Sequence, residues 1–203
     1  MENLYKLYDA GVRAIALTWN FANCFGYPNF PKEEYRNQGL TEFGKLAVEE
    51  MNRLGMMIDV SHLSDGGFYD VAKISRKPFI ASHSDCRAVT DHPRNLTDDM
   101  IRLLAEKGGV AGINFAPDFA GTGSKSDECQ IEDLVRHVLH FIRTGGEDCV
   151  GIGTDFDGVF GNLEIDEPAK MDHLFDALKK VGITERQLDK IASENVLRVI
   201  KKC

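Results

Sequence analysis

Apolar, β-favouring runs alternate with amphipathic segments along most of the chain. Five of these runs are almost continuously apolar, as expected of parallel strands that are covered on both faces. They occupy residues 12–18, 56–61, 78–82, 109–115 and 149–154. Such runs separated by amphipathic stretches predict an α/β fold, in which crossover helices join the strands of a parallel sheet.

The segments between the predicted strands carry helix start and stop signals. Residues 41–54 place apolar side chains at helical spacing, and Gly55 follows as a C-terminal cap. Thr97 starts a further helix that Gly108 ends, and residues 184–187 match a capping box that opens a last helix to about residue 201. No linker or low-complexity segment divides the chain. We therefore expect residues 1–203 to form part of a single domain.

Charge and composition exclude several classes of partner. The formal net charge is -8 and the pI is near 5.3, and the basic residues are scattered, which argues against a nucleic-acid partner. The five cysteines include no C-x-x-C pair and fit a reducing compartment. Neither a leader segment nor a run of about 20 apolar residues is found. We expect a cytoplasmic protein with no membrane contact.

Polar side chains follow three of the predicted strands. His62 and His83 come directly after the second and third strands, and Asp155 ends the fifth. Because the carboxyl ends of parallel strands meet at one edge of a sheet, these side chains are candidates for a shared site. Imidazole and carboxylate groups are zinc ligands, so the pattern predicts a metal centre. Asp59 and Asp157 either orient a ligand or satisfy backbone donors of the loops.

The same strings resemble the renal, or membrane, dipeptidase family of zinc peptidases. The resemblance lies in residues 58–62 (Ile-Asp-Val-Ser-His), 78–84 (Pro-Phe-Ile-Ala-Ser-His-Ser), 93–96 (Pro-Arg-Asn-Leu) and 153–158 (Gly-Thr-Asp-Phe-Asp-Gly). The spacing also agrees with the family, since 83 minus 62 gives 21 and 94 minus 83 gives 11. The similarity runs from about Leu4 to the C-terminus.

The resemblance implies a TIM-type (β/α)8 barrel that binds two zinc ions and hydrolyses the peptide bond of dipeptides. By position, His62 and His83 would bind one zinc ion. Asp155 would bind the other and accept the proton of the attacking water. Arg94 would bind the terminal carboxylate of the substrate, for which its planar pair of donors is well shaped.

Other features depart from the family pattern. The family's His-x-Asp pair at the end of the first barrel strand and its bridging Glu are not found, and residues 83–85 (His-Ser-Asp) lie at family strand six instead. The five strands thus correspond to family strands four to eight of an incomplete barrel. We therefore expect this C-terminal portion to bind zinc partially or singly and to show little peptidase activity. Its exposed sheet edges predict a homo-oligomer or pairing between edges.

A further departure is Trp19, which stands where many members carry a histidine. Trp19 and Asn20 are predicted to shape the wall of the substrate pocket, and packing at the rim is an equal alternative for Trp19.

Two alternatives to the dipeptidase interpretation stay open. In the first, the chain is a non-catalytic subunit or binding protein derived from a barrel. In the second, it is another metal-dependent amidohydrolase, for instance one that acts on a cyclic amide. Arg94 distinguishes the dipeptidase from the other amidohydrolase, because a substrate without a free carboxylate would not bind through Arg94.

Overall fold

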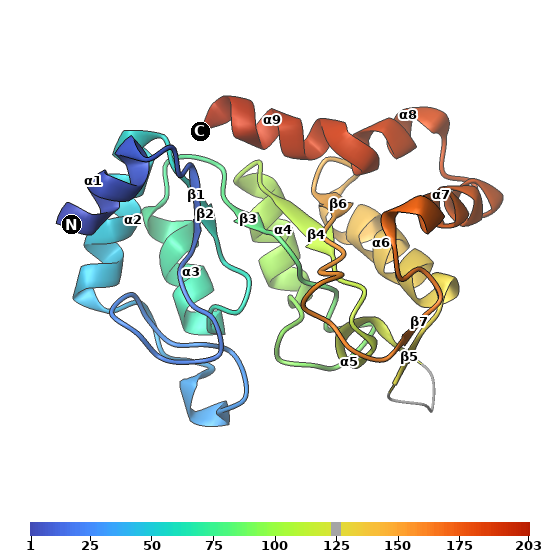
Figure 1. The fold of residues 1–203 in the computed structure, drawn as a ribbon, viewed down its shortest axis with the longest axis horizontal. Helices are drawn as coiled ribbons and strands as arrows, with labels where there is room; N and C mark the ends of the chain where they lie inside the picture. The colour runs from blue at the N-terminus through green and yellow to red at the C-terminus, as the bar shows by residue number, and fades with distance from the viewer. Residues whose placement is uncertain (123–126) are drawn as a thin grey trace.

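Five parallel strands form the centre of the protein in this computed structural model, which describes residues 1–122 and 127–203 (Figure 1). The sheet order is β1-β2-β3-β4-β6. The strands are β1 (Ala14–Ala16), β2 (Met57–Asp59), β3 (Ile80–Ala81), β4 (Val110–Ile113) and β6 (Val150–Ile152). Each lies inside one of the predicted runs, so all five strand predictions are confirmed. The strands are shorter than predicted, because residues at both ends of each apolar run belong to the adjoining loops.

Helices connect consecutive strands and pack against the sheet. Coverage on both faces, which the apolar runs predict, is wrong for β1, where Ala14 and Ala16 are exposed. The helices are α1 (Glu2–Asp9), α2 (Glu42–Leu54), α3 (Asp65–Ile74), α4 (Asp98–Glu106), α5 (Pro117–Ala120), α6 (Ile131–Gly145), α7 (Met171–Lys180), α8 (Glu185–Asp189) and α9 (Asn195–Lys202). Short 3-10 turns lie at Glu33–Tyr35 and Pro168–Lys170. A separate small sheet pairs β5 (Glu128–Cys129) with β7 (Asn162–Leu163). None of the helices in the described residues combines the length and apolarity needed to cross a membrane.

The predicted helix ends are mostly confirmed. The hydroxyl of Thr41 accepts a hydrogen bond from the Gly44 amide at 2.9 Å, and Gly55 adopts a left-handed φ of 75°. Thr97 caps α4, and the predicted capping box opens α8. The predicted last helix is confirmed as a continuous helical run over residues 185–202, and a π-helical turn at Lys190–Glu194 interrupts its regular geometry between α8 and α9.

A tertiary contact accompanies that interruption. The buried Asn195 follows the π turn, and its side-chain amide donates to the carbonyls of Glu147 and Val150, each at 2.8 Å. This contact ties the start of α9 to the start of β6. Local helix propensity does not encode such an anchor, and π turns inside helices have few sequence signals.

The C-terminal helices close the amino-terminal side of the sheet. In Figure 1, α8 and α9 lie along the top, while the long loop after β1 lies at the bottom. Lys77, just before β3, donates to the Cys203 carbonyl at 2.5 Å, and Arg198 donates to the Gly108 and Asp148 carbonyls at 2.6 Å. The opposite side, where the strands end, therefore carries the loops.

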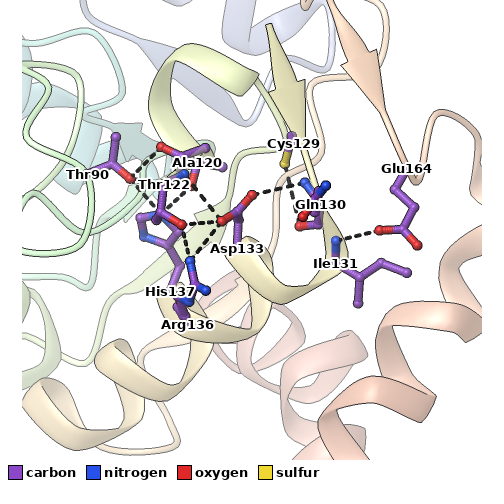
Figure 2. Close-up of polar contacts among 11 residues, drawn as sticks. Thr90, Ala120, Thr122, Cys129, Gln130, Ile131, Asp133, Arg136, His137 and Glu164 are labelled. Atoms are coloured by element: carbon purple, nitrogen blue, oxygen red, sulfur yellow. Dashed lines mark hydrogen bonds and ion pairs between the residues drawn. The ribbon is translucent and has the colours of Figure 1, made fainter. Parts of the chain in front are cut away.

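A buried carboxylate organises the start of α6 (Figure 2). Asp133 accepts hydrogen bonds from the Gln130 amide at 3.1 Å and from the Thr122 amide at 3.3 Å, and it also accepts from the Thr122 hydroxyl. Arg136, one turn later, pairs with the same carboxylate at 3.1 Å. Asp133 thus fixes the helix start and the chain at Thr122 together.

We expect Asp133→Ala to lower the free energy of unfolding by about 2–3 kcal/mol, because it removes a helix cap and leaves donors without an acceptor. Urea denaturation followed by circular dichroism measures the change. Glu132→Ala is the matched control, since Glu132 lies in the same helical turn but is exposed. Equal destabilisation by the two variants would contradict the role given to Asp133.

Candidate active site

Two histidines meet where neighbouring strands end. His62 follows β2 and His83 follows β3, and these strands pair in parallel with Asp59 opposite Ile80. This register places the imidazoles edge to face, with their Nε2 atoms 2.9 Å apart. The sequence prediction that the two histidines share a site is therefore consistent with their placement.

Backbone strain marks the same place. His62 has a φ of 68° and Asp155 a φ of 60°, and within residues 1–122 and 127–203 they are the non-glycine residues with a positive φ. A left-handed backbone costs a non-glycine residue free energy, and such residues gather at functional sites. Both strained residues are candidates singled out from the sequence.

The imidazoles are half-buried and neutral. Burial lowers the pKa of His62 to about 3, with further lowering by Arg94 and His83. Burial and Arg94 also lower the pKa of His83, against the opposing effect of Asp59 and Asp155. Neutral imidazoles are the form that binds metal ions, so the pair has the right protonation at neutral pH.

The donor set fits a divalent cation at the two Nε2 atoms. Two ligand nitrogens 2.9 Å apart are close enough to share one ion, since zinc–nitrogen bonds are about 2.0–2.1 Å. Among the residues that the structure describes, however, no group of three or more His, Cys, Asp or Glu side chains is arranged to hold a metal ion. The structure thus brings His62 and His83 together without placing Asp155 in a three-ligand set with them.

Asp155 lies near these groups on the loop after β6. Its Oδ2 accepts a hydrogen bond from the side-chain amide of the buried Asn114 at 3.3 Å. A turn follows, in which the Gly158 amide donates to the Asp155 carbonyl at 2.8 Å. The charge of Asp155 acts on both His83 and Arg94 and opposes the lowering of each pKa by burial. Asp155 is therefore within electrostatic range of His83 and Arg94.

Arg94 is a buried cation with donors to spare. Its side chain is 2% exposed, and its Nη2 donates to the His83 carbonyl at 3.4 Å. Its Nε and Nη1 have no hydrogen-bond partner. Burial lowers its pKa to about 10, while Asp155, Asp59 and Asp85 raise it, so the guanidinium stays charged at neutral pH. An anion is the partner that such a group lacks.

Trp19 and Asn20, both predicted to contact substrate, differ in their placement. Trp19 is 62% exposed and packs edge-on against Phe21, with the ring centroids 5.9 Å apart. Asn20 instead directs its Oδ1 at the Nδ1 of His62, 3.0 Å away. Asn20 thus contacts a candidate ligand, a role that the sequence analysis did not assign.

The two ambiguous aspartates are also distinguished. Asp157 is exposed. Asp59 is buried and accepts hydrogen bonds from the Ser61 and Ser82 amides, each at 2.9 Å. It also accepts from the Ser82 hydroxyl at 2.5 Å. Asp59 therefore satisfies backbone donors and, through Ser82, reaches His83. Ser82 and Asn114 were missed as site residues, because a lone serine or asparagine beside a strand has no distinguishing pattern.

Comparisons with known proteins find similar sequences along almost the whole chain. The sequence profile described as membrane dipeptidase (peptidase family M19) matches residues 1–203. An uncharacterized protein from the pqqA 5' region of Klebsiella pneumoniae is 37% identical over 98% of this chain and 75% of its own length. An uncharacterized dipeptidase of Schizosaccharomyces pombe is 36% identical over 98% of this chain, which spans 48% of that relative.

A solved structure is similar in the same way. The metallopeptidase from Rhodobacter sphaeroides, liganded with a phosphinate mimic of the dipeptide L-Ala-D-Ala, superposes with a TM-score of 0.89 at 34% identity. The match covers 99% of this chain and 58% of that structure. The α/β prediction is confirmed, and the fold corresponds to part of the length of that relative.

Proposed function

Because the chain belongs to the membrane dipeptidase family of metallopeptidases, we propose that its site serves the zinc-dependent hydrolysis of dipeptides. One observation supports this most: the two Nε2 atoms converge at 2.9 Å, and the nearby Arg94 is a buried guanidinium with unpaired donors. A metal-binding pair beside an anion-binding group suits a small substrate that carries a free carboxylate next to the bond to be cleaved.

His62 and His83 would hold the zinc ion. Asp155, which the resemblance assigns to a second zinc ion, is not a ligand of this one. When bound, zinc polarises the peptide carbonyl and lowers the pKa of a water molecule. The described residues place one imidazole pair at one point, and we propose one zinc ion per chain. Tight binding of two zinc ions per chain would overturn this stoichiometry.

Arg94 and Asp155 supply the remaining chemistry. The free Nε and Nη1 donors of Arg94 would bind the terminal carboxylate of the dipeptide and orient the peptide bond. Asp155, held by Asn114 at one oxygen, would accept the proton of the attacking water at its carboxylate. The exposed Trp19 would line the rim of the pocket.

The test is hydrolysis of L-Ala-D-Ala by the zinc-loaded chain, which we expect to be slow because the chain is proposed to hold one zinc ion where the resemblance implies two. We expect Arg94→Ala to raise the KM about 10–100-fold, because a charge-assisted pair with the substrate carboxylate is lost. Asp155→Asn is expected to lower kcat and leave KM nearly unchanged. Arg102→Ala is the matched control, since Arg102 is an exposed arginine on α4 that pairs with Asp99.

Other outcomes identify the alternatives. Hydrolysis of a cyclic amide that is indifferent to Arg94→Ala would point to another metal-dependent amidohydrolase. Zinc binding without hydrolysis of either substrate would overturn the enzyme proposal and favour a non-catalytic subunit.

A further inference from the structure

The Nδ1 atom of each histidine in the pair has its own hydrogen-bond partner. His62 Nδ1 faces Asn20 Oδ1 at 3.0 Å. An amide oxygen accepts hydrogen bonds and cannot donate them, so His62 must carry its hydrogen on Nδ1. The Nε2 of a neutral His62 then carries a lone pair, and this lone pair points toward His83.

The hydrogen-bond partners of His83 also place its hydrogen on Nδ1, here through two groups. His83 Nδ1 lies 2.7 Å from the Ser82 hydroxyl, which also lies 2.5 Å from Asp59 Oδ2. A carboxylate only accepts, so the single hydroxyl hydrogen of Ser82 goes to Asp59. The Ser82 oxygen then accepts from His83, which places the hydrogen on Nδ1 and the lone pair on Nε2.

Asp59 also fixes the backbone directly before both histidines. Its Oδ1 accepts from the Ser61 and Ser82 amides, each at 2.9 Å, and these residues directly precede His62 and His83. The Ser61 hydroxyl in turn accepts from the His83 amide at 3.0 Å. The buried carboxylate of Asp59 therefore joins the ends of β2 and β3. Through the Ser82 hydroxyl it also acts on the orientation of the His83 imidazole.

Two lone pairs facing each other at 2.9 Å repel unless positive charge lies between them. We propose that Asn20 and the Ser82–Asp59 pair are positioning residues, which hold both imidazoles with hydrogen on Nδ1 and so present both Nε2 lone pairs to one divalent cation. This inference rests on the proposed metal site. It assigns the coordinating nitrogen of each histidine and the groups that select it.

The first measurement uses the zinc-loaded chain, labelled with 15N in its histidines, at neutral pH. The 15N shifts are expected to show hydrogen on Nδ1 of both His62 and His83. Asn20→Ala should release His62 and Ser82→Ala should release His83, each giving a mixture of tautomers. Asn20→Asp and Ser82→Thr keep an acceptor and should restore the Nδ1–H form.

The second measurement is zinc affinity by competition with a chelating dye. Each alanine variant should bind zinc about 10–100-fold more weakly, and each conservative variant should recover most of that loss. Ser84→Ala is the control, because Ser84 is a buried serine on the other side of His83 and its hydroxyl contacts neither imidazole in the described residues. A purely structural role would not produce tautomer changes confined to one histidine.

The outcomes separate this inference from the proposed function. Unchanged tautomers and unchanged zinc affinity in both alanine variants would overturn the positioning role, even if the wild-type chain hydrolyses dipeptides. Zinc binding with the expected losses but no hydrolysis would support the positioning role and overturn the proposed enzyme. If Ser82→Ala does not fold, Asn20→Ala decides the question alone, since Asn20 lies in a half-exposed loop.

Discussion

Gly158→Ala is expected to lower kcat at least about 100-fold, because an error near 1 Å in the position of a reacting group is enough for such a loss. An alanine Cβ at this position would lie 2.3 Å from Asp155 Oδ1 and 3.0 Å from its Cγ. The first distance is shorter than real Cβ contacts allow and the second is tight, so the carboxylate has to move. Gly158 does not have a positive φ, so its backbone accepts alanine and only the contact with Asp155 is strained.

The kinetics of L-Ala-D-Ala hydrolysis by the zinc-loaded chain test this expectation. KM should change little, since Arg94 is not touched by the substitution. Gly26→Ala is the matched control, because it also lies in a loop after a strand and its added Cβ meets its nearest neighbour at an ordinary 3.4 Å. An unchanged kcat in Gly158→Ala would mean that Asp155 does not act in the proton transfer.

Much of this site was predictable, because a continuous apolar run without alternating polar residues indicates a buried parallel strand. His62 and His83 each follow such a run, and the pairing of β2 with β3 then brings them together. His62 makes its Nε2 contact from a backbone with a positive φ, which no residue pattern predicts. The sequence therefore predicted which two histidines lie together, but not the geometry of their contact.

The supporting groups were beyond sequence reasoning for a different reason. Asn20 meets His62 across 42 residues of chain, through a loop whose path depends on tertiary packing. The β5–β7 pair has two residues in each strand, which is too short for any periodicity. The π turn before Asn195 likewise reflects contacts with Glu147 and Val150 that lie far away in sequence.

Zinc affinity is expected to depend unusually weakly on pH in the acidic range. Two ordinary histidines, each with a pKa near 6.5, would together lose about 1000-fold in affinity between about pH 7.5 and about pH 5, because protons compete for both nitrogens. Here burial and Arg94 hold the pKa of His62 at about 3 and lower that of His83. Protons therefore compete poorly until the pH falls well below the ordinary range.

The sign of the effect follows from the depressed pKa values. A histidine that stays neutral in the folded protein needs no deprotonation before it binds zinc, so lowering the pH to about 5 should weaken binding by less than about 30-fold, the loss expected from one ordinary histidine. Competition titrations at both pH values measure this, with circular dichroism to confirm that the chain stays folded. Arg94→Met is the informative variant, because removing the nearby cation should raise both histidine pKa values and steepen the pH dependence. A loss near 1000-fold in the wild-type chain would show that the imidazoles protonate as they do in water.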